Sequence, residues 1–141
     1  MIERLILDAG PLGQLSNPRA STEVAERAAR LFDSGFDLYI SEVADYEVRR
    51  NLLLHQKASS IVRLNQLHAI CRYAPITTPV MRKAAELWAD SRRQGKPTSD
   101  PKELDCDVVL AAHALALGAS VITDNIGHLS RFVTTQRWAD L

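Results

Sequence analysis

The fold is decided by residues Leu5 to Leu12, which read LILDAGPL. The first three of these residues form a short apolar run, typical of a strand that is buried on both faces of a parallel sheet. Asp8 comes directly after this run, and the Gly10-Pro11 pair ends the strand because proline has no N–H for a sheet ladder. We therefore expect Asp8 at the carboxyl end of a central strand, where open α/β sheets have their binding crevice.

Helical and strand-like patterns alternate along the rest of the chain. We expect helices over about residues 21–33, 42–54, 57–70, 103–117 and from residue 78 up to a loop at 95–101, and strands over 36–40, 71–74, 119–123 and 132–133. Ser21 and Ser41 are suited to cap the first two helices. Apolar side chains of the helix that begins at Thr78 are expected to face the core, namely Met81, Ala84, Ala85 and Trp88. The alternation predicts one α/β domain over residues 1–141, with right-handed crossovers.

Composition excludes several classes of protein. Lysine plus arginine and aspartate plus glutamate number 17 each, so net charge neither indicates nor excludes a nucleic-acid partner. No apolar stretch reaches the ~18–20 residues of a membrane span, and no signal peptide opens the chain. Cys71 and Cys106 lack zinc-site spacing and are expected to be small buried hydrophobes. These features favour a cytoplasmic protein.

Acidic residues recur at places that the carboxyl edge of a parallel sheet would bring together. They are Asp8 after the first strand, Glu47 on the helix after the second, Asp105 and Asp107 at the start of the 103–117 helix, and Asp124 with Asn125 after the fourth strand. Clustered carboxylates repel one another unless a cation lies between them, and oxygen ligands suit Mg²⁺ or Mn²⁺. Such ions activate water and stabilise the leaving oxygen of a phosphodiester, so the pattern favours phosphodiester hydrolysis.

Each of these residues also has an ordinary structural explanation. Asp8 and Asp124 could form turns, and Glu47 could pair with Arg50 on the surface of a helix. Of Asp105 and Asp107, which lie about 200° apart on a helix, one is expected to cap the helix and the other to be a ligand. Asp107 is the better ligand candidate because it lies at the start of the apolar face of that helix, where an unpaired charge would be costly. The four histidines have no metal-site spacing, and His113 is expected in the core.

Four motifs, in order along residues 5–132, give the chain a family resemblance. They are LILDAGPL with Asp8, ISEVADYEVRR with its Ser41-to-Glu47 interval, DCDVVLAAHAL with Asp107, and VITDNIGHLSRF after the fourth strand. Together they resemble the PIN-domain superfamily of metal-dependent ribonucleases, and within it the virulence-associated protein C type of toxin from bacterial toxin–antitoxin pairs.

The resemblance implies a three-layer α/β/α sandwich around a parallel four- or five-stranded sheet, an acidic pocket for Mg²⁺ or Mn²⁺, and cleavage of single-stranded RNA. It makes Asp8, Glu47 and Asp107 the catalytic acids and metal ligands, with Asp124 or Asn125 completing the metal pocket. Thr123 would position a water or form the fourth corner, with Ser41 in support. Asn125 stands where many members have an acid, which puts a second metal site in doubt, and Asp105 could compensate. Arg49, Arg50, Lys96 and Arg131 are the candidates for contacts with RNA phosphates.

The resemblance also implies an antitoxin partner and a homodimer. The helices over residues 21–33 and 57–70 could form a groove for an antitoxin helix.

Three alternatives compete with this interpretation, and the residues of the chain disfavour the first two. A haloacid-dehalogenase-like domain needs a second aspartate at residue 10, which is glycine here, and a receiver-like domain needs paired acids after the first strand. The third alternative is a catalytically weak or inactive PIN-like module that binds nucleic acid or protein.

Overall fold

Five parallel strands form one sheet in the order β3-β2-β1-β4-β5 in this computed structural model, which describes residues 2–95 and 101–141, and the side chains of all of these except 101–104. The strands are β1 (Arg4–Leu7), β2 (Asp37–Ser41), β3 (Arg72–Ala74), β4 (Ser120–Thr123) and β5 (Thr135–Arg137). In the register of the central strand, Leu5 lies opposite Leu38 of β2 and Ser120 of β4. Since both faces of β1 are covered, its apolar run is fully buried, as predicted.

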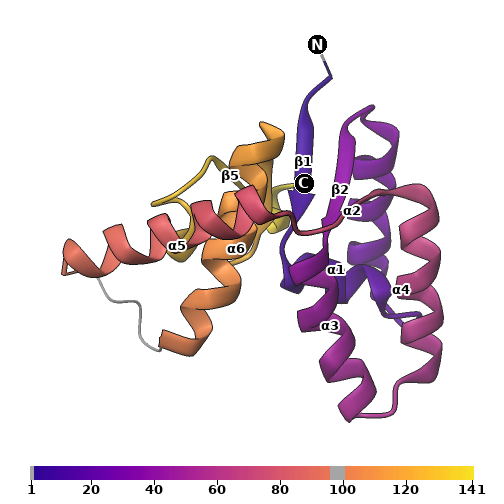
Figure 1. Cartoon of the computed structure of the whole chain (residues 1–141). Coiled ribbons are helices and arrows are strands. Elements are labelled where there is room, and N and C mark those ends of the chain that lie inside the picture. Colours follow the sequence, from indigo (N-terminus) through magenta and orange to yellow (C-terminus); the bar gives the residue numbers. More distant parts are fainter. Residues whose placement is uncertain (1, 96–100) are drawn as a thin grey trace.

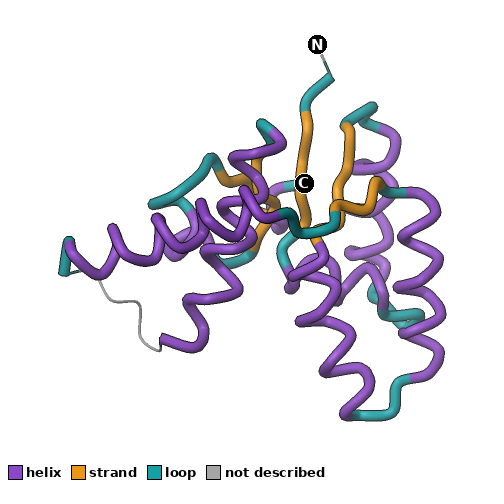
Figure 2. Tube along the Cα trace, viewed as in Figure 1, coloured by secondary structure: helices purple, strands orange, loops and turns teal. Residues whose placement is uncertain are grey.

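Helices cover both faces of this sheet (Figures 1 and 2). They are α1 (Ala9–Ser16), α2 (Thr22–Asp33), α3 (Glu42–Leu54), α4 (Ala58–Ile70), α5 (Thr78–Arg93), α6 (Pro101–Leu117) and α7 (Ile126–Leu129), with a 3₁₀ turn at Trp138–Asp140. Leu5 and Leu7 pack with α1 to α4 on one face, whereas Ile6 packs with α6 and α7 on the other. The α/β/α sandwich around a parallel sheet is therefore confirmed.

Helix α1 occupies a segment that the sequence suggested was a turn and loop. Its N-terminus is stabilised by Asp8, whose Oδ1 accepts a hydrogen bond of 2.8 Å from the Ala9 amide. Pro11 lies in the first turn, where a helix does not need the missing N–H. The Gly-Pro pair thus ends β1 correctly but begins a helix immediately afterwards.

Other predicted features shift for physical reasons. The fifth strand begins at Thr135, not at Phe132, because the amides of Phe132 and Val133 both donate to the Leu129 carbonyl in a turn after α7. Helix α6 begins at Pro101, so Asp105 lies inside the helix and does not cap it. The predicted loop at 95–101 falls largely outside the described residues.

The apolar side chains of α5 do not all face the core. Met81 is 49% exposed and Ala85 is exposed, whereas Ala84 is buried against α6. Among the described residues, no helix combines the length and the apolar character that crossing a bilayer requires.

Candidate active site

Asp8 is held in a fixed orientation at the carboxyl end of β1. Its backbone amide donates to the Ile122 carbonyl of the neighbouring strand β4 at 2.9 Å. Its Oδ1 caps α1, and its Oδ2 accepts a hydrogen bond of 2.7 Å from Thr123 Oγ1. Because an amide and a hydroxyl each donate to one oxygen, the side chain is ordered before any ligand binds.

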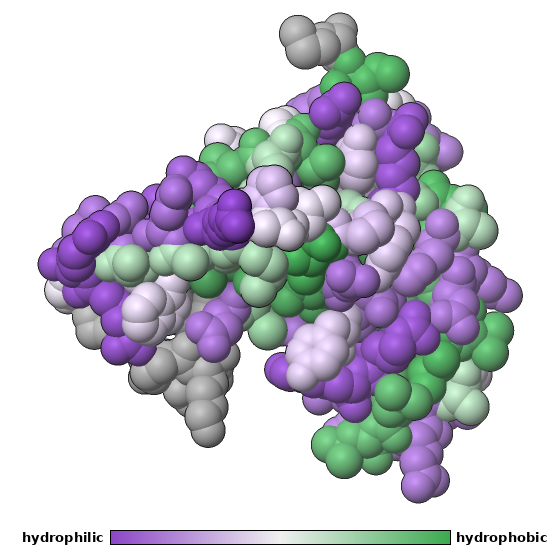
Figure 3. Space-filling view, in the orientation of Figure 1, coloured by the Kyte–Doolittle hydropathy of each residue, from purple (hydrophilic) through white to green (hydrophobic). Residues whose placement is uncertain are grey.

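Glu47 and Asp107 lie close to Asp8, although they come from different helices. The pKa of the Glu47 carboxyl is raised to about 7, mainly by burial and also by the negative charges of Asp8 and Asp107. The charges of Asp8 and Asp107 both act on Glu47, so these two carboxylates lie within electrostatic range of it near the carboxyl edge of the sheet. The surface is hollowed between α3, which carries Glu47, and α6, which carries Asp107 (Figure 3).

These carboxylates do not form a compact cluster. Within residues 2–95 and 105–141, no three histidine, cysteine, aspartate or glutamate side chains are gathered closely enough to form a ready-made metal centre. The donor set nevertheless fits a hard divalent cation, since all three groups are carboxylates. A cation bound there would favour the ionised form of Glu47 and relieve the repulsion that raises its pKa.

Thr123, Asp124 and Asn125 continue the site from the end of β4. Thr123 is fully buried, and its Oγ1 accepts from the Asn125 amide at 2.9 Å while it donates to Asp8. Asp124 is exposed, and its Oδ2 accepts a hydrogen bond of 3.4 Å from Gln14 Nε2 of α1. Asn125 is exposed at the start of α7. Thr123 therefore contacts Asp8 directly and Asn125 is linked to it through Thr123, whereas the side chain of Asp124 is directed toward α1.

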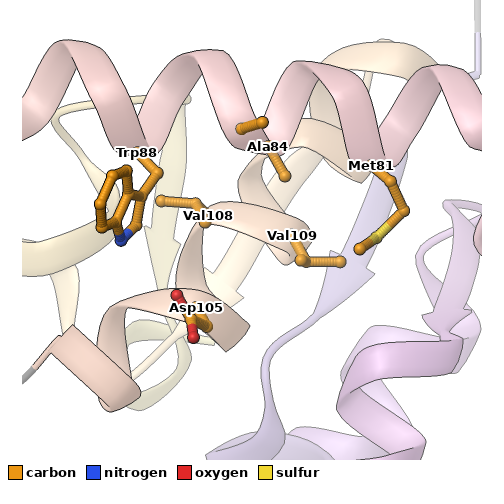
Figure 4. A pocket seen from close by; sticks show the side chains of 7 residues that line it. Met81, Ala84, Trp88, Asp105, Val108 and Val109 are labelled. Atoms are coloured by element: carbon orange, nitrogen blue, oxygen red, sulfur yellow. The ribbon is translucent and has the colours of Figure 1, made fainter.

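Two predicted supporting residues lie elsewhere. Ser41 is fully buried, and its hydroxyl shares a hydrogen bond of 2.8 Å with His113 Nδ1 while accepting from the Val43 amide. Asp105 lies on the α5 side of α6, in a surface pocket that also contains Met81 and Trp88 (Figure 4). The structure therefore does not bring Ser41 or Asp105 into the group of three acids.

The predicted phosphate contacts differ in their availability. Arg49 is bound on the α4 side of α3, where it donates to both oxygens of Asp45 at 3.0 Å and to Asn65 at 2.9 Å. Arg50 is exposed and lies 5.1 Å from the centre of the Tyr46 ring, and Arg131 is exposed beside Phe132. Lys96 lies outside the described residues. Arg50 is thus more exposed than Arg49, whose guanidinium is bound to Asp45 and Asn65.

Sequence reasoning missed two neighbours of the acidic group. The half-buried Cys106 thiol donates a hydrogen bond to Glu47, and burial together with the Glu47 charge raises the pKa of this thiol to about 11. His128 Nδ1 lies 3.8 Å from Asp107 Oδ2. A signal for His128 was available, because it follows Thr123 at the same edge of the sheet, whereas the Cys106 contact depends on the packing of α6 against α3.

Comparison with known sequences identifies one family. The family model described as PIN domain matches residues 6–132. No curated protein sequence matches the chain.

Solved structures share the fold over nearly the whole chain. One is VapBC2 from Rickettsia felis bound to a promoter DNA fragment, with 16% identity, a TM-score of 0.77, and coverage of 96% of this chain and 98% of that chain. FitAcB from Neisseria gonorrhoeae has 22% identity and a TM-score of 0.74, with coverage of 97% and 99%. VapBC-1 from nontypeable Haemophilus influenzae has 22% identity and a TM-score of 0.72, with coverage of 96% and 98%.

Proposed function

Because this chain belongs to the PIN domain family, we propose that it is a divalent-metal-dependent ribonuclease that hydrolyses phosphodiester bonds within single-stranded RNA. The observation that supports this proposal most strongly is that Asp8, which follows β1, and Asp107 of α6 both act electrostatically on the partly buried Glu47 of α3. Their mutual repulsion contributes to a Glu47 pKa of about 7. Carboxyl groups with a raised pKa are enriched at functional sites, and a metal-dependent hydrolase needs carboxylates to hold its cation.

The residues of the site divide into two sets of roles. Asp8, Glu47 and Asp107 would hold the cation, and Thr123 keeps Asp8 oriented toward it. Mg²⁺ or Mn²⁺, when bound, supplies an activated water and neutralises charge on the phosphate. Arg50 and Arg131 would bind flanking phosphates of the RNA, since both side chains are exposed. Asp124 and Asn125 are secondary candidates for ligands at the same edge.

Two aspartates on α6 provide a matched test of this assignment. Asp107 belongs to the acidic group, whereas Asp105, two residues earlier, lies in the pocket against α5. We expect Asp107→Asn to lower Mn²⁺-dependent cleavage of single-stranded RNA at least ~100-fold, and Asp105→Asn to leave it within about twofold.

The same cleavage assay decides between the nuclease and the non-catalytic alternative. Full activity of Asp107→Asn would contradict the assigned site. A wild-type protein that cleaves no RNA with either ion would favour a module that only binds nucleic acid or protein.

We also propose that the protein is the toxin of a toxin–antitoxin pair in the cytoplasm. The sequence resembles the virulence-associated protein C type, and the structure shares its fold with chains of VapBC and FitAcB complexes. Large apolar side chains are exposed on α3 and α4, including Leu54 at 73%, Val62 at 56% and Ile70 at 64%. An apolar surface of this kind suits a partner helix.

Co-expression with the product of the adjacent open reading frame tests the partner. We expect the two proteins to co-purify, and Val62→Asp to weaken the complex without lowering RNA cleavage by the free protein. A complex unaffected by this substitution would exclude the α4 surface. Homodimer formation, expected from the resemblance, is tested by sedimentation of the same samples.

A further inference from the structure

A groove of about 450 Å³ lies between α1 and α3 and opens beside Glu47. Small residues of α1 form one wall, and Val48, Asn51 and Leu52 of α3 form the other. Its volume lies in the ~300–1,000 Å³ range of small-ligand sites. The groove therefore continues directly from the acidic group and has room for part of a substrate.

Two glycines in α1 keep this groove open. A glycine within a helix costs about 1 kcal/mol relative to alanine. Neither Gly10 nor Gly13 has a positive φ, and an added Cβ would lie only 3.7 Å from Asp124 Oδ2 or 4.0 Å from Val48 Cγ2, which are ordinary contact distances. Backbone conformation and packing thus do not require glycine at either position. Both glycines leave the helix without a side chain on the wall of the groove.

Two side-chain amides border the groove. The amide of Gln14 is held in one orientation, since its Oε1 accepts from Trp138 Nε1 at 2.8 Å and its Nε2 is directed toward Asp124. Asn51 lies one turn after Glu47 on α3 and is exposed, and its side chain makes no hydrogen bond to any part of the chain that the structure describes. An oriented amide and an available amide thus lie beside apolar surface.

The chemistry of the groove fits an uncharged planar ligand. Glu47 and Asp124 border it and disfavour a phosphate or an acidic side chain. A nucleobase has broad faces that can pack against the apolar wall of Ala9, Val48 and Leu52, and polar edges that pair with amides. Single-stranded RNA presents such bases unpaired.

We propose that this groove binds one unpaired base of the RNA, next to the phosphodiester that is cleaved, and that Asn51 reads the edge of that base. The base lies over the backbone at Gly10 and Gly13, and Gln14 supplies a second polar contact. This inference rests on the proposed ribonuclease activity and makes the groove the source of a base preference.

Cleavage of a randomised single-stranded RNA pool, with sequencing of the cut ends, tests the inference. We expect the wild-type protein to prefer certain bases at one position beside the cut. Asn51→Ala should reduce this preference about five- to tenfold and leave preferences at other positions unchanged. Gly13→Met should fold with an unchanged or higher Tm, because it replaces a helical glycine, yet lower kcat/KM for the preferred RNA about tenfold or more. Gln66→Ala, exposed on α4, is the control and should match the wild type.

Each other outcome has a definite meaning. If the wild type cleaves RNA but Asn51→Ala and Gly13→Met retain its base preference and rate, the inference is overturned and the nuclease proposal stands. Loss of antitoxin binding with an unchanged base preference also overturns it, because the groove would then hold a protein segment. A wild type that cleaves no RNA overturns both proposals.

Discussion

The surroundings of Glu47 oppose the ionisation of its carboxyl group. Its folded-state pKa is raised from the ordinary 4.5 to about 7, by burial first and then by the charges of Asp8 and Asp107. The folded protein therefore binds this proton more tightly than the unfolded chain does. In the absence of metal, the resulting stability is fully present below the unfolded pKa and is lost as the pH rises through about 7.

The raised pKa of Glu47 predicts how the unfolding free energy depends on pH. Between about pH 4.5 and pH 7, the Glu47 carboxyl should cost the metal-free wild type about 1–2 kcal/mol of unfolding free energy, after allowance for solvent screening of the partly exposed group. Burial lowers the pKa of His113 and acts in the opposite direction, so the Glu47 effect is measured as the difference between the wild type and Glu47→Gln. Glu47→Gln should remove that loss, and the exposed control Glu26→Gln should retain it. Urea titrations at a series of pH values measure the effect. Identical pH profiles for the wild type and Glu47→Gln would contradict the raised pKa.

Helix α3 is fixed by polar contacts on the side opposite to Glu47. Asp45 is 12% exposed, and it accepts from Arg49 at 3.0 Å and from His68 Nε2 at 2.8 Å. Burial alone would raise the pKa of Asp45, but the hydrogen bonds from Arg49 and His68 outweigh it and lower the pKa. These contacts link α3 to α4 and so help to position Glu47.

The contact of Asp45 with Arg49 can be tested by removing the carboxylate. Asp45→Ala should lower the free energy of unfolding by about 2–4 kcal/mol, because it leaves the partly buried Arg49 without its carboxylate. Asp90→Ala, which removes an exposed pair with Arg93 on α5, should change it by less than about 0.5 kcal/mol. Denaturant unfolding compares the two variants. Equal effects would show that the contact between α3 and α4 contributes little.

Elements with strong local signals could be predicted from the sequence. Helix α3 has its predicted bounds because Ser41 caps it, and β1 is recognisable because its short apolar run is buried on both faces. Helix α1 could not be predicted from its glycines and proline, since its start depends on a cap by Asp8. The position of β5 depends on a turn after α7 and on pairing with β4, which a three-residue strand does not reveal by itself.

The candidate site was predictable to the extent that it follows from parallel topology. Asp8 and Thr123 end neighbouring strands, so their side chains meet at one edge. The choice of Asp107 over Asp105 followed from helical periodicity. The pairing of Arg49 with Asp45 carried a readable signal, an acid four residues before a base, whereas the contact of Cys106 with Glu47 depends on tertiary packing.

At the scale of the whole molecule, metal binding should couple the two faces of the sheet. The proposed ligands come from β1, α3 and α6, so a bound cation joins both helical layers through the central strand. Mn²⁺ at about 100 times its Kd should therefore stabilise the fold by about 2.7 kcal/mol. Asp105→Asn should keep this gain, and Asp107→Asn should lose most of it. Differential scanning calorimetry with Mn²⁺, and again after chelation, measures the shift, and equal shifts in both variants would place the ion elsewhere.

The most direct measurement is a crystal structure of the protein soaked in Mn²⁺, with the ion located by its anomalous scattering. We expect an ion bound by carboxylate oxygens of Asp8, Glu47 and Asp107, directly or through ordered water. An ion bound at any other place, with these three carboxylates left uncoordinated, would contradict the proposed active site.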